Sequence, residues 1–348
     1  GFGSDADHVK TTHDIDRMVK AGFTMFTIDS GDHVVNEAEA LPLSEMTSRA
    51  QMIPWELFND TFDEFMLRYA GNRISVADDF SIQAKEEEVL RALVKYGAVV
   101  AHIVKIDRHL KVHYPDYPYE LEISVDETDS PTSPLEHFVV GNELRRLGIQ
   151  VTSLAPRFVA EFEKGIDYKG DLEVFRKEFI KHLKIAERLG PYKISIHSAS
   201  DKFSIYDVIG SLHQGYVHVK TAGTSYLEAL RTIAVVDSDL LREILEFARN
   251  QYETEKLTYH VSADLNKVPS PKHCSSEELQ ELFEHDDARQ VLHVTFGKVL
   301  TSRDQNGEFV IREKILRCLS ENEETHYEFL VRRFRRHVEA FGERSLVI

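Results

Sequence analysis

The stretch from residue 192 to residue 230 constrains the fold more than any other part of the chain. It contains two short apolar runs, 193–197 and 215–221, and each carries a histidine before it leads into Gly, Ala and Ser. Runs of this length between small residues are typical of buried strands. Polar side chains at the end of a buried strand are costly unless they are paired. His197, His218 and Lys220 therefore indicate a functional site rather than packing.

The same pattern of apolar strand, polar strand end, loop and amphipathic helix recurs along the chain. It predicts strands at 23–28, 121–125, 150–154, 193–197, 216–219, 258–262 and 291–295, after an incomplete first strand that ends near Gly3. Strands that alternate with helices predict a parallel sheet. Eight such strands predict an α/β fold of the TIM type, a (β/α)8 barrel. An open, doubly wound sheet is the alternative, although no GxGxxG motif follows a strand.

Three segments between these strands carry clear helix signals. Residues 171–189 place apolar side chains on one stripe and end before Gly190. Residues 133–148 begin with Pro134 and with a capping box between Ser133 and Glu136. A third helix is predicted to start at Ser225, with Glu228 completing the same kind of box.

A long segment after the second predicted strand interrupts this pattern. Residues 32 to about 118 are too many for a βα loop, and they include the single Trp, Trp55. We interpret residues 1–348 as one catalytic barrel domain in which 32–83 form an insertion or lid and a helix follows from Ala84. An ordinary long surface excursion explains the same segment equally well.

Composition excludes several classes of protein. The net charge is −17, which argues against a nucleic-acid partner. No apolar run approaches transmembrane length, so no membrane partner is expected. The two cysteines show neither metal nor redox spacing and exclude a disulfide framework. No signal peptide is visible, and we expect a cytoplasmic enzyme.

The predicted strand ends carry many acidic and basic side chains, which a barrel would gather at one rim. They are Asp7, His8, Asp29, Asp126, Glu127, Arg157, His197, His218, Lys220, His260, Asp264 and His293. Carboxylates and imidazoles from several strands are the ligands that a divalent metal needs. With 17 histidines in the chain, some of these alignments arise by chance. The signal lies in the group as a whole.

The sequence TAGTS at 221–225 leads from a predicted strand directly into a predicted helix. A helix N-terminus offers free backbone N–H groups and the positive end of the helix dipole. Together with Lys220, this segment could hold a carboxylate or a phosphate. A tight turn with a salt-bridged lysine is an equally good explanation.

Several motifs together resemble the tagaturonate epimerase family across nearly the whole chain, least clearly at 37–82. These motifs are SDADHVKT, FTIDSGDHV, SVDET followed by TSP, SLAPRFV, EKGIDY, YKISIHSASDKFS, HVKTAGTSYLEALR, YHVSADL and DDARQVLHVTFG. The resemblance implies interconversion of D-tagaturonate and D-fructuronate with a divalent metal whose identity is unknown. It also implies a family that is longer at its N-terminus than this chain.

The two ketohexuronates differ at a carbinol carbon that is not adjacent to the ketone, so simple enolisation cannot invert it. One path is retro-aldol cleavage, rotation of the aldehyde and re-attack on its other face, with a metal as Lewis acid. The other path is direct removal of the C–H proton by one of two bases. Both paths need two acid/base groups. The resemblance implies an acid and a base but does not decide between the paths.

We assign Asp7 and Glu127 as the two acid/base groups, although one of them could instead be a metal ligand and the other a partner that orients a histidine. The metal ligands are predicted to be His8, His197 and His218, with His260 in reserve. The substrate carboxylate is predicted to bind Arg157, Lys220, Thr224 and Ser225.

Two other functions remain compatible with these residues. A metal-dependent sugar isomerase or aldolase would share the metal site and differ in stereochemical outcome. A non-catalytic barrel that binds a sugar acid need not lose its function in chelator. In every case the expected partner is a small-molecule sugar acid. The basic cluster at 332–336 on the last helix is compatible with internal ion pairs or with a homo-oligomer contact.

Overall fold

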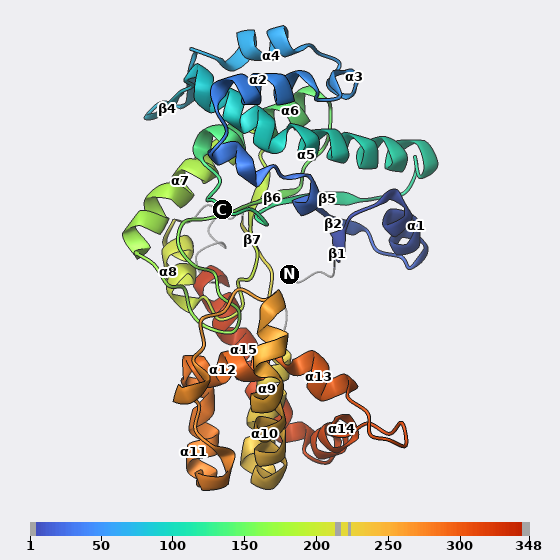
Figure 1. Cartoon of the computed structure of the whole chain (residues 1–348), viewed down its shortest axis with the longest axis vertical. Coiled ribbons are helices and arrows are strands. Elements are labelled where there is room, and N and C mark those ends of the chain that lie inside the picture. The colour runs from blue at the N-terminus through green and yellow to red at the C-terminus, as the bar shows by residue number, and fades with distance from the viewer. Residues whose placement is uncertain (1–4, 213–216, 222–223, 343–348) are drawn as a thin grey trace. The chain divides into compact units, whose positions relative to one another are not determined.

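Six parallel strands form the main sheet of the chain (Figure 1). The computed structural model describes residues 5–212, 217–221 and 224–342. The strands are β1 (Ala6–Val9), β2 (Met25–Asp29), β5 (Glu120–Val125), β6 (Ser153–Pro156), β7 (Lys193–Ile196) and β8 (Val217–Val219). Five of the predicted strands are thereby confirmed, within a few residues at their ends. The α/β class is confirmed with them.

Neighbouring strands in the sheet are also consecutive among its strands in the sequence. The order is β1-β2-β5-β6-β7-β8, and each pair is parallel. A doubly wound sheet requires the strand order to reverse at a switch point. Because this order never reverses, the doubly wound alternative is wrong. The strands form a curled half-barrel instead.

The register of the sheet sets apolar and polar rows side by side. One row runs from Ile28 through Ile123, Leu154 and Ile194, all of them fully buried, to Val217. The row one residue earlier joins Thr27, Glu122 and Ser153, which are also buried. Such polar groups are tolerated in a buried sheet only where they bond one another.

A TIM barrel of eight parallel strands is not confirmed, because six strands of the described residues form the parallel sheet and the other two form a separate hairpin. Thr258 closes a 3-10 helix, η3 (Lys256–Thr258), and no strand follows it up to Ser262. Residues 291–295 belong mostly to helix α12 (Asp286–Val294). A short apolar run cannot be distinguished from a buried helix segment by its pattern alone. Strand β1 spans Ala6–Val9, and the predicted end of a first strand near Gly3 falls on residues 1–4, which lie outside the described part.

The chain divides into two compact units, although we interpreted its sequence as one domain. Unit 1 comprises residues 1–159, 173–197 and 216–219 and contains the whole main sheet. Unit 2 comprises residues 160–172, 198–215 and 220–348. In unit 1 the connecting helices include α1 (Thr12–Lys20), α5 (Glu86–His113), α6 (Pro134–Arg146) and α7 (Leu172–Leu189, whose first residue belongs to unit 2).

The helix signals of the sequence were largely correct. Ser133 and Glu136 form the predicted capping box of α6, with Pro134 in its first turn. Helix α7 spans Leu172–Leu189, close to the predicted 171–189. Helix α9 (Thr224–Val236) begins one residue before Ser225, so Ser225 lies inside the helix and the predicted capping box there was wrong.

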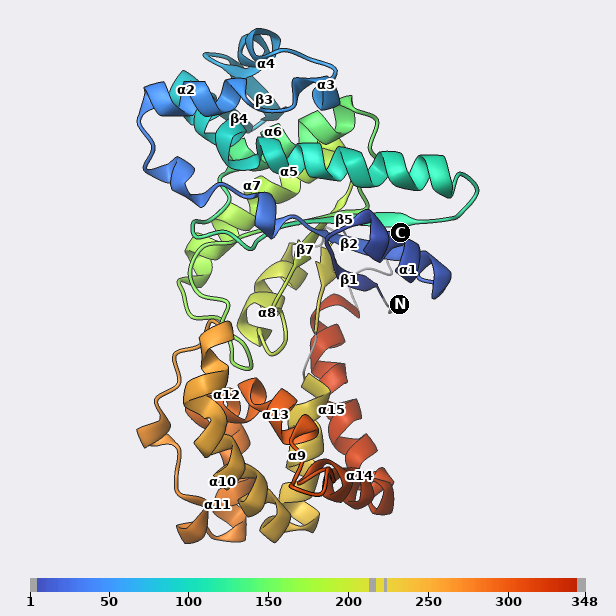
Figure 2. The same ribbon diagram turned by 45° about the vertical axis from the view of Figure 1, so that its right-hand side comes forward.

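The segment 32–83 folds into short helices and a hairpin of its own. Its elements are η2 (Asn36–Glu39), α2 (Leu43–Gln51), α3 (Trp55–Phe58), α4 (Phe62–Tyr69), β3 (Arg73–Ala77) and β4 (Phe80–Gln83), and η1 (Gly31–His33) leads into it. Figure 2 shows α2, α3 and α4 on the side of α5 that faces away from the sheet. Trp55 packs against Phe58 and Phe65 there, and its Nε1 donates to the carbonyl of Ala50 at 3.1 Å. Its role as a lid stays a prediction.

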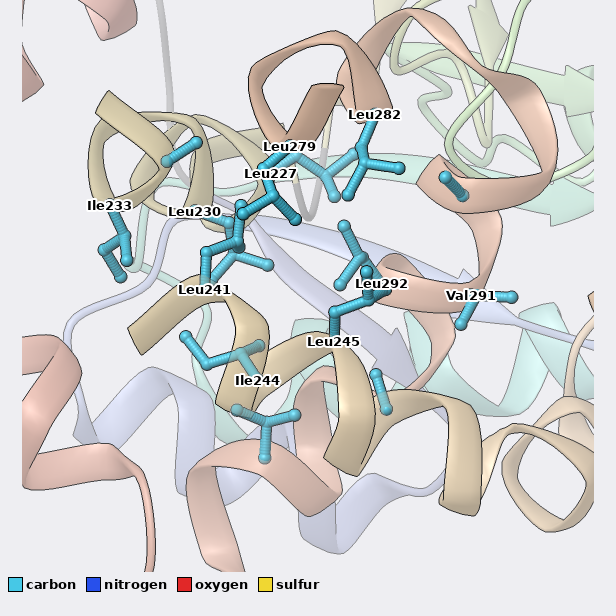
Figure 3. Packing of buried hydrophobic residues seen from close by; sticks show 14 of the residues in the cluster. Leu227, Leu230, Ile233, Leu241, Ile244, Leu245, Leu279, Leu282, Val291 and Leu292 are labelled. Carbon is cyan, nitrogen blue, oxygen red and sulfur yellow. The ribbon is translucent and has the colours of Figure 1, made fainter. Parts of the chain in front are cut away.

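Unit 2 is built mainly of helices around one apolar core (Figure 3). Helix α10 (Ser238–Glu255) is capped by Asp237 and places Leu241, Leu245 and Tyr252 in this core, all completely buried. The other helices are α8 (Phe203–Ser211), α11 (Ser276–Glu281), α13 (Phe296–Thr301), α14 (Arg312–Glu321) and α15 (Glu323–Gly342), with η4 (Leu265–Lys267), η5 (Pro271–His273) and η6 (Leu282–Glu284). No described helix is long and apolar enough to span a membrane.

Candidate functional site

Glu122 is a completely buried carboxylate in the middle of β5. The strand register sets it beside Thr27 and Ser153. Thr27 Oγ1 donates to Glu122 Oε1 at 3.2 Å, and Ser153 Oγ donates to Glu122 Oε2 at 2.5 Å. A buried carboxylate is stable only with such donors, and two hydroxyls do not saturate it.

Two of the predicted metal ligands provide the remaining donors. His197, which follows β7, places Nε2 2.7 Å from Glu122 Oε1. His218, on β8, places Nδ1 2.6 Å from Glu122 Oε2. The structure therefore brings His197 and His218 together around one carboxylate. In metal sites, a ligating histidine almost always donates its other ring N–H to such a group.

The ring nitrogen that does not contact Glu122 determines whether His197 or His218 can bind a further group. His218 Nε2 has no partner among the residues that the structure describes. His197 Nδ1 lies 3.1 Å from Asp126 Oδ1, just beyond the end of β5. Burial alone would lower the pKa of His197, but Asp126 and Glu122 outweigh it and raise that pKa to about 9. Burial would raise the pKa of Asp126, but the charge of His197 and its hydrogen bond outweigh burial and lower that pKa.

A second cluster lies at the ends of β1 and β2. His8, Asp29 and Glu127 place one possible ligand atom each within 4.8 Å of one another, and no other set of three among the described residues does so. His8 Nδ1 lies 3.0 Å from Asp29 Oδ2, and Lys10 Nζ lies 3.6 Å from the same oxygen. His8 adopts a left-handed backbone conformation, with φ of 54°. Such a conformation is uncommon for a residue other than glycine and often marks a functional site.

The electrostatics of this cluster separate its two carboxyl groups. Burial would raise the pKa of Asp29, but hydrogen bonds from His8 and from the Gly31 amide, with the charge of Lys10, lower it to about 2. Burial and the charges of Asp29 and Asp126 raise the pKa of Glu127. One carboxyl group is thus held ionised while its neighbour is biased towards the protonated form. Such a pair suits acid/base chemistry.

Gly31 permits this close approach. A Cβ atom at this position would lie 3.0 Å from Glu127 Oε2 and 3.3 Å from Asp29 Oδ1. The Gly31 amide already donates to Asp29 Oδ1 at 3.0 Å. A larger residue would therefore push the two carboxylates away from their present positions.

Both residues predicted for acid/base catalysis lie beside His8. Asp7 Oδ2 is 3.7 Å from His8 Nε2, and Asp7 Oδ1 accepts from the His8 amide at 3.0 Å. Glu127 belongs to the same cluster as His8. The three predicted imidazole ligands, in contrast, do not form one set by distance, because His8 turns to Asp29 while His197 and His218 turn to Glu122.

The residues predicted to bind the substrate carboxylate belong to both units, Arg157 to unit 1 and the other three to unit 2. Arg157 lines a cavity of about 180 Å³ with Thr132, Ser133 and His182, but its Nη1 donates to the carbonyl of Thr128. Lys220 belongs to unit 2, where its carbonyl accepts from the Ala199 amide at 3.2 Å. Thr224 and Ser225 form the first turn of α9, and nothing is described of the Thr224 side chain. His260, the reserve ligand, is exposed and pairs with Glu161 in unit 2.

The sequence did not predict a role for Glu122, and it indicated Asp29 and Asp126 only as strand-end residues. A signal for Glu122 was present, because a glutamate inside the apolar run LEISV must face a partner if the strand is buried. Its partners are distant in sequence, and only the strand register reveals them.

Comparison with known proteins shows which family the chain belongs to. A sequence model of the tagaturonate epimerase family matches residues 1–341. A tagaturonate/fructuronate epimerase from Thermotoga maritima is 43% identical over 345 residues, which cover 97% of this chain and 67% of that protein.

Solved structures show the same similarity. The native crystal structure of fructuronate-tagaturonate epimerase UxaE from Cohnella laeviribosi has a TM-score of 0.91 and 35% identity, covering 98% of this chain and 68% of that one. A glycerol complex of the same enzyme has a TM-score of 0.90 and 34% identity, with the same coverage. The chain therefore spans about two thirds of the length of these relatives. It belongs to the tagaturonate epimerase family, a family of isomerases.

Proposed function

We propose that this chain interconverts D-tagaturonate and D-fructuronate. The observation that carries this proposal is the 43% identity, over 97% of the chain, to a protein named for that reaction. The clusters of unit 1 support it, because they combine carboxyl groups held at different pKa values with imidazoles. A sugar isomerase or an aldolase would use similar groups, and product analysis distinguishes the three.

The donor groups fit a divalent metal. Glu122 orients His197 and His218, and it leaves His218 Nε2 without a partner in the described part of the chain. His8 and Asp29 meet at 3.0 Å, and a divalent cation would displace the proton that this contact needs. We propose that His8, His197 and His218 hold the metal, with Asp29 beside them. Binding would require the three imidazoles to converge, because His8 Nδ1 now pairs with Asp29 and the two ring nitrogens of His197 pair with Glu122 and Asp126. When bound, the metal supplies a Lewis acid for the oxygen atoms of the substrate.

The carboxyl groups Asp7 and Glu127 would move the protons. Glu127, whose pKa is raised, is suited to deliver a proton to an oxygen of the substrate. Asp7 is partly exposed and would take the proton from the substrate hydroxyl in the same direction of reaction. The two roles exchange when the reaction runs backwards. Glu127 could instead be a metal ligand, since its carboxylate lies within 4.8 Å of the ligand atoms of His8 and Asp29.

Incubation of the purified chain with D-tagaturonate and a panel of divalent metals tests the proposed function. The appearance of D-fructuronate by NMR, its loss in chelator and its return with one metal would support it. A retro-aldol path retains the carbinol C–H hydrogen in D₂O, whereas direct proton removal exchanges it unless the proton is returned internally. Cleavage products would indicate an aldolase, and a different sugar acid would indicate another isomerase.

The metal assignment has its own test. The double variant His197→Ala, His218→Ala should bind less metal than the wild type when metal content is measured after dialysis. His182→Ala is a suitable control, because His182 is also a buried histidine of unit 1 but contacts His137 rather than Glu122. Unchanged metal content in the double variant would reject His197 and His218 as ligands.

A further inference from the structure

Four motifs that the clusters of unit 1 do not use lie together in unit 2. They are EKGIDY (163–168), SASDKF (198–203), HVSADL (260–265) and DDARQVLHVTFG (286–297). Glu163, from the first motif, is a buried carboxylate. Its Oε2 accepts from the Ser262 amide at 3.0 Å, from Ser262 Oγ at 2.7 Å and from Gln290 Nε2 at 2.7 Å. One carboxylate therefore joins three of the four motifs.

Two buried cations hold the loop that follows Glu163. The ammonium of Lys202, which is fully buried, donates to the carbonyls of Glu163 at 2.7 Å and of Ile166. Arg289 Nε donates to the carbonyl of Gly165 at 2.7 Å, and the same guanidinium pairs with Asp201. Burying charged groups costs free energy, and their retention is best explained when they fix one conformation. These contacts fix the position of residues 163–166.

The fixed loop sets Lys164 and His293 beside one another. Lys164 Nζ donates to Ser198 Oγ at 2.7 Å. Next to Lys164, Gly165 packs against His293, and a Cβ on the glycine would lie in ordinary van der Waals contact with the His293 Cβ, at 3.4 Å. Lys220 lies near the same loop, because its carbonyl accepts from the amide of Ala199, the residue after Ser198.

His293 is the unusual member of this group. Only 7% of its surface is exposed, and its imidazole has no hydrogen bond or ion pair with any residue that the structure describes. Burial lowers its pKa to about 4, and the charges of Lys164, Arg289 and Lys202 contribute. A neutral imidazole carries one N–H donor. Neither ring nitrogen of His293 is both fully buried and unpaired, so this donor is accessible to a ligand. A donor without a partner, surrounded by cations, is suited to an anionic acceptor.

We infer that Lys164, Ser198 and His293 form a binding site in unit 2 for the carboxylate of a sugar acid. The ammonium of Lys164 pairs with the carboxylate, and the imidazole N–H of His293 donates to its second oxygen or to the adjacent hydroxyl. This inference rests on the proposed function for the identity of the sugar acid.

Titration calorimetry of the full chain with D-fructuronate and with D-fructose tests the site. Fructose carries CH₂OH where fructuronate carries the carboxylate, and both epimers of the uronate keep that group during turnover. Lys164→Met should weaken fructuronate binding by about 10- to 100-fold, the usual effect of losing a charge-assisted hydrogen bond. His293→Phe keeps a ring of similar size and should also weaken it. Neither change should alter the response to fructose.

Lys267→Met is the matched control, because Lys267 is an exposed lysine of unit 2 whose side chain has no hydrogen bond or ion pair with a described residue. It should bind fructuronate as the wild type does. Circular dichroism of each variant shows whether it is folded.

Each outcome supports or overturns the carboxylate site, the proposed epimerase function, or both. Unchanged fructuronate affinity in folded Lys164→Met and His293→Phe overturns the carboxylate site, even where the wild type epimerises. Weakened binding in both variants supports the site. If the wild type binds fructuronate but yields no tagaturonate, the proposed function is wrong and the variants still decide the site. A wild type that binds no fructuronate overturns both.

Discussion

Replacing the buried carboxylate of Glu122 by an amide should destabilise unit 1. The Glu122→Gln side chain keeps its size, but it puts an NH₂ group against donors that lie 2.5 to 2.7 Å from the carboxylate oxygens. Removing one partner of a buried ion pair costs about 3–5 kcal/mol. Because the amide oxygen can still accept one of these hydrogen bonds, we expect a loss near the lower limit, about 3 kcal/mol in metal-free protein.

The loss should depend on pH, because the folded state raises the pKa of His197 from 6.5 to about 9. The folded state therefore holds the proton more tightly, and the resulting stability is complete below pH 6.5 and is lost as the pH rises to about 9. A pKa difference of this size corresponds to about 3 kcal/mol, shared between Asp126 and Glu122. Glu122→Gln keeps only the Asp126 part of this effect. The variant should therefore lose less stability than the wild type as the pH rises from 6.5 to about 9.

Urea unfolding followed by tryptophan fluorescence measures this effect. Trp55 is the single tryptophan and belongs to unit 1, so its emission reports the unfolding of that unit. Chelator is present throughout, because a bound metal would compete with the proton on His197. Glu120→Gln is the control, as it makes the same substitution at an exposed position of the same strand. Equal midpoints for Glu122→Gln and Glu120→Gln below pH 6.5 would refute the role assigned to Glu122.

Three further predictions follow from the site and the insertion. Asp7→Asn and Glu127→Gln should each lower turnover by about 10²–10⁴-fold while metal content stays the same; metal loss that excess metal reverses would make the residue a ligand instead. Gly31→Ala should lower turnover because its Cβ would meet Glu127 Oε2 at 3.0 Å, whereas Gly297→Ala, with open space around it, should not, and equal rates would contradict this explanation. If residues 32–83 close as a lid, fructuronate should shift Trp55 emission; constant emission would leave the segment as a packing element.

The fold could be predicted from sequence wherever strand and helix signals agreed. The run YKISIH between Gly190 and small residues predicts a strand, and β7 confirms it. The run VLHVT at 291–295 has similar composition but lies in α12 and the residue after it, where every residue from Ala288 to Thr295 is buried. A window of five residues holds less than two helical turns, so its period could not separate the two cases.

The candidate site was predicted in its residue types and only partly in its partners. Strand ends identified His8, His197 and His218 because the end of a parallel strand is where polar side chains gather. Which of them meet depends on cross-strand register and on carboxylates inside the strands, neither of which strand-end reasoning contains. Glu122 pairs with both His197 and His218, and Asp29 pairs with His8.

The roles of the unit 2 motifs could not be predicted from sequence for a similar reason. Glu163, Lys202 and Arg289 are ordinary charged residues in sequence, and charged residues are mostly exposed. Their burial is visible only in the structure, where each charged group bonds to the backbone or to a side chain of another motif. Buried charged groups that are hydrogen-bonded in this way hold the loop in place. His293 is also buried, but its imidazole has no hydrogen-bond partner among the described residues. That difference separates the residues that hold the loop from the one we expect to contact a ligand.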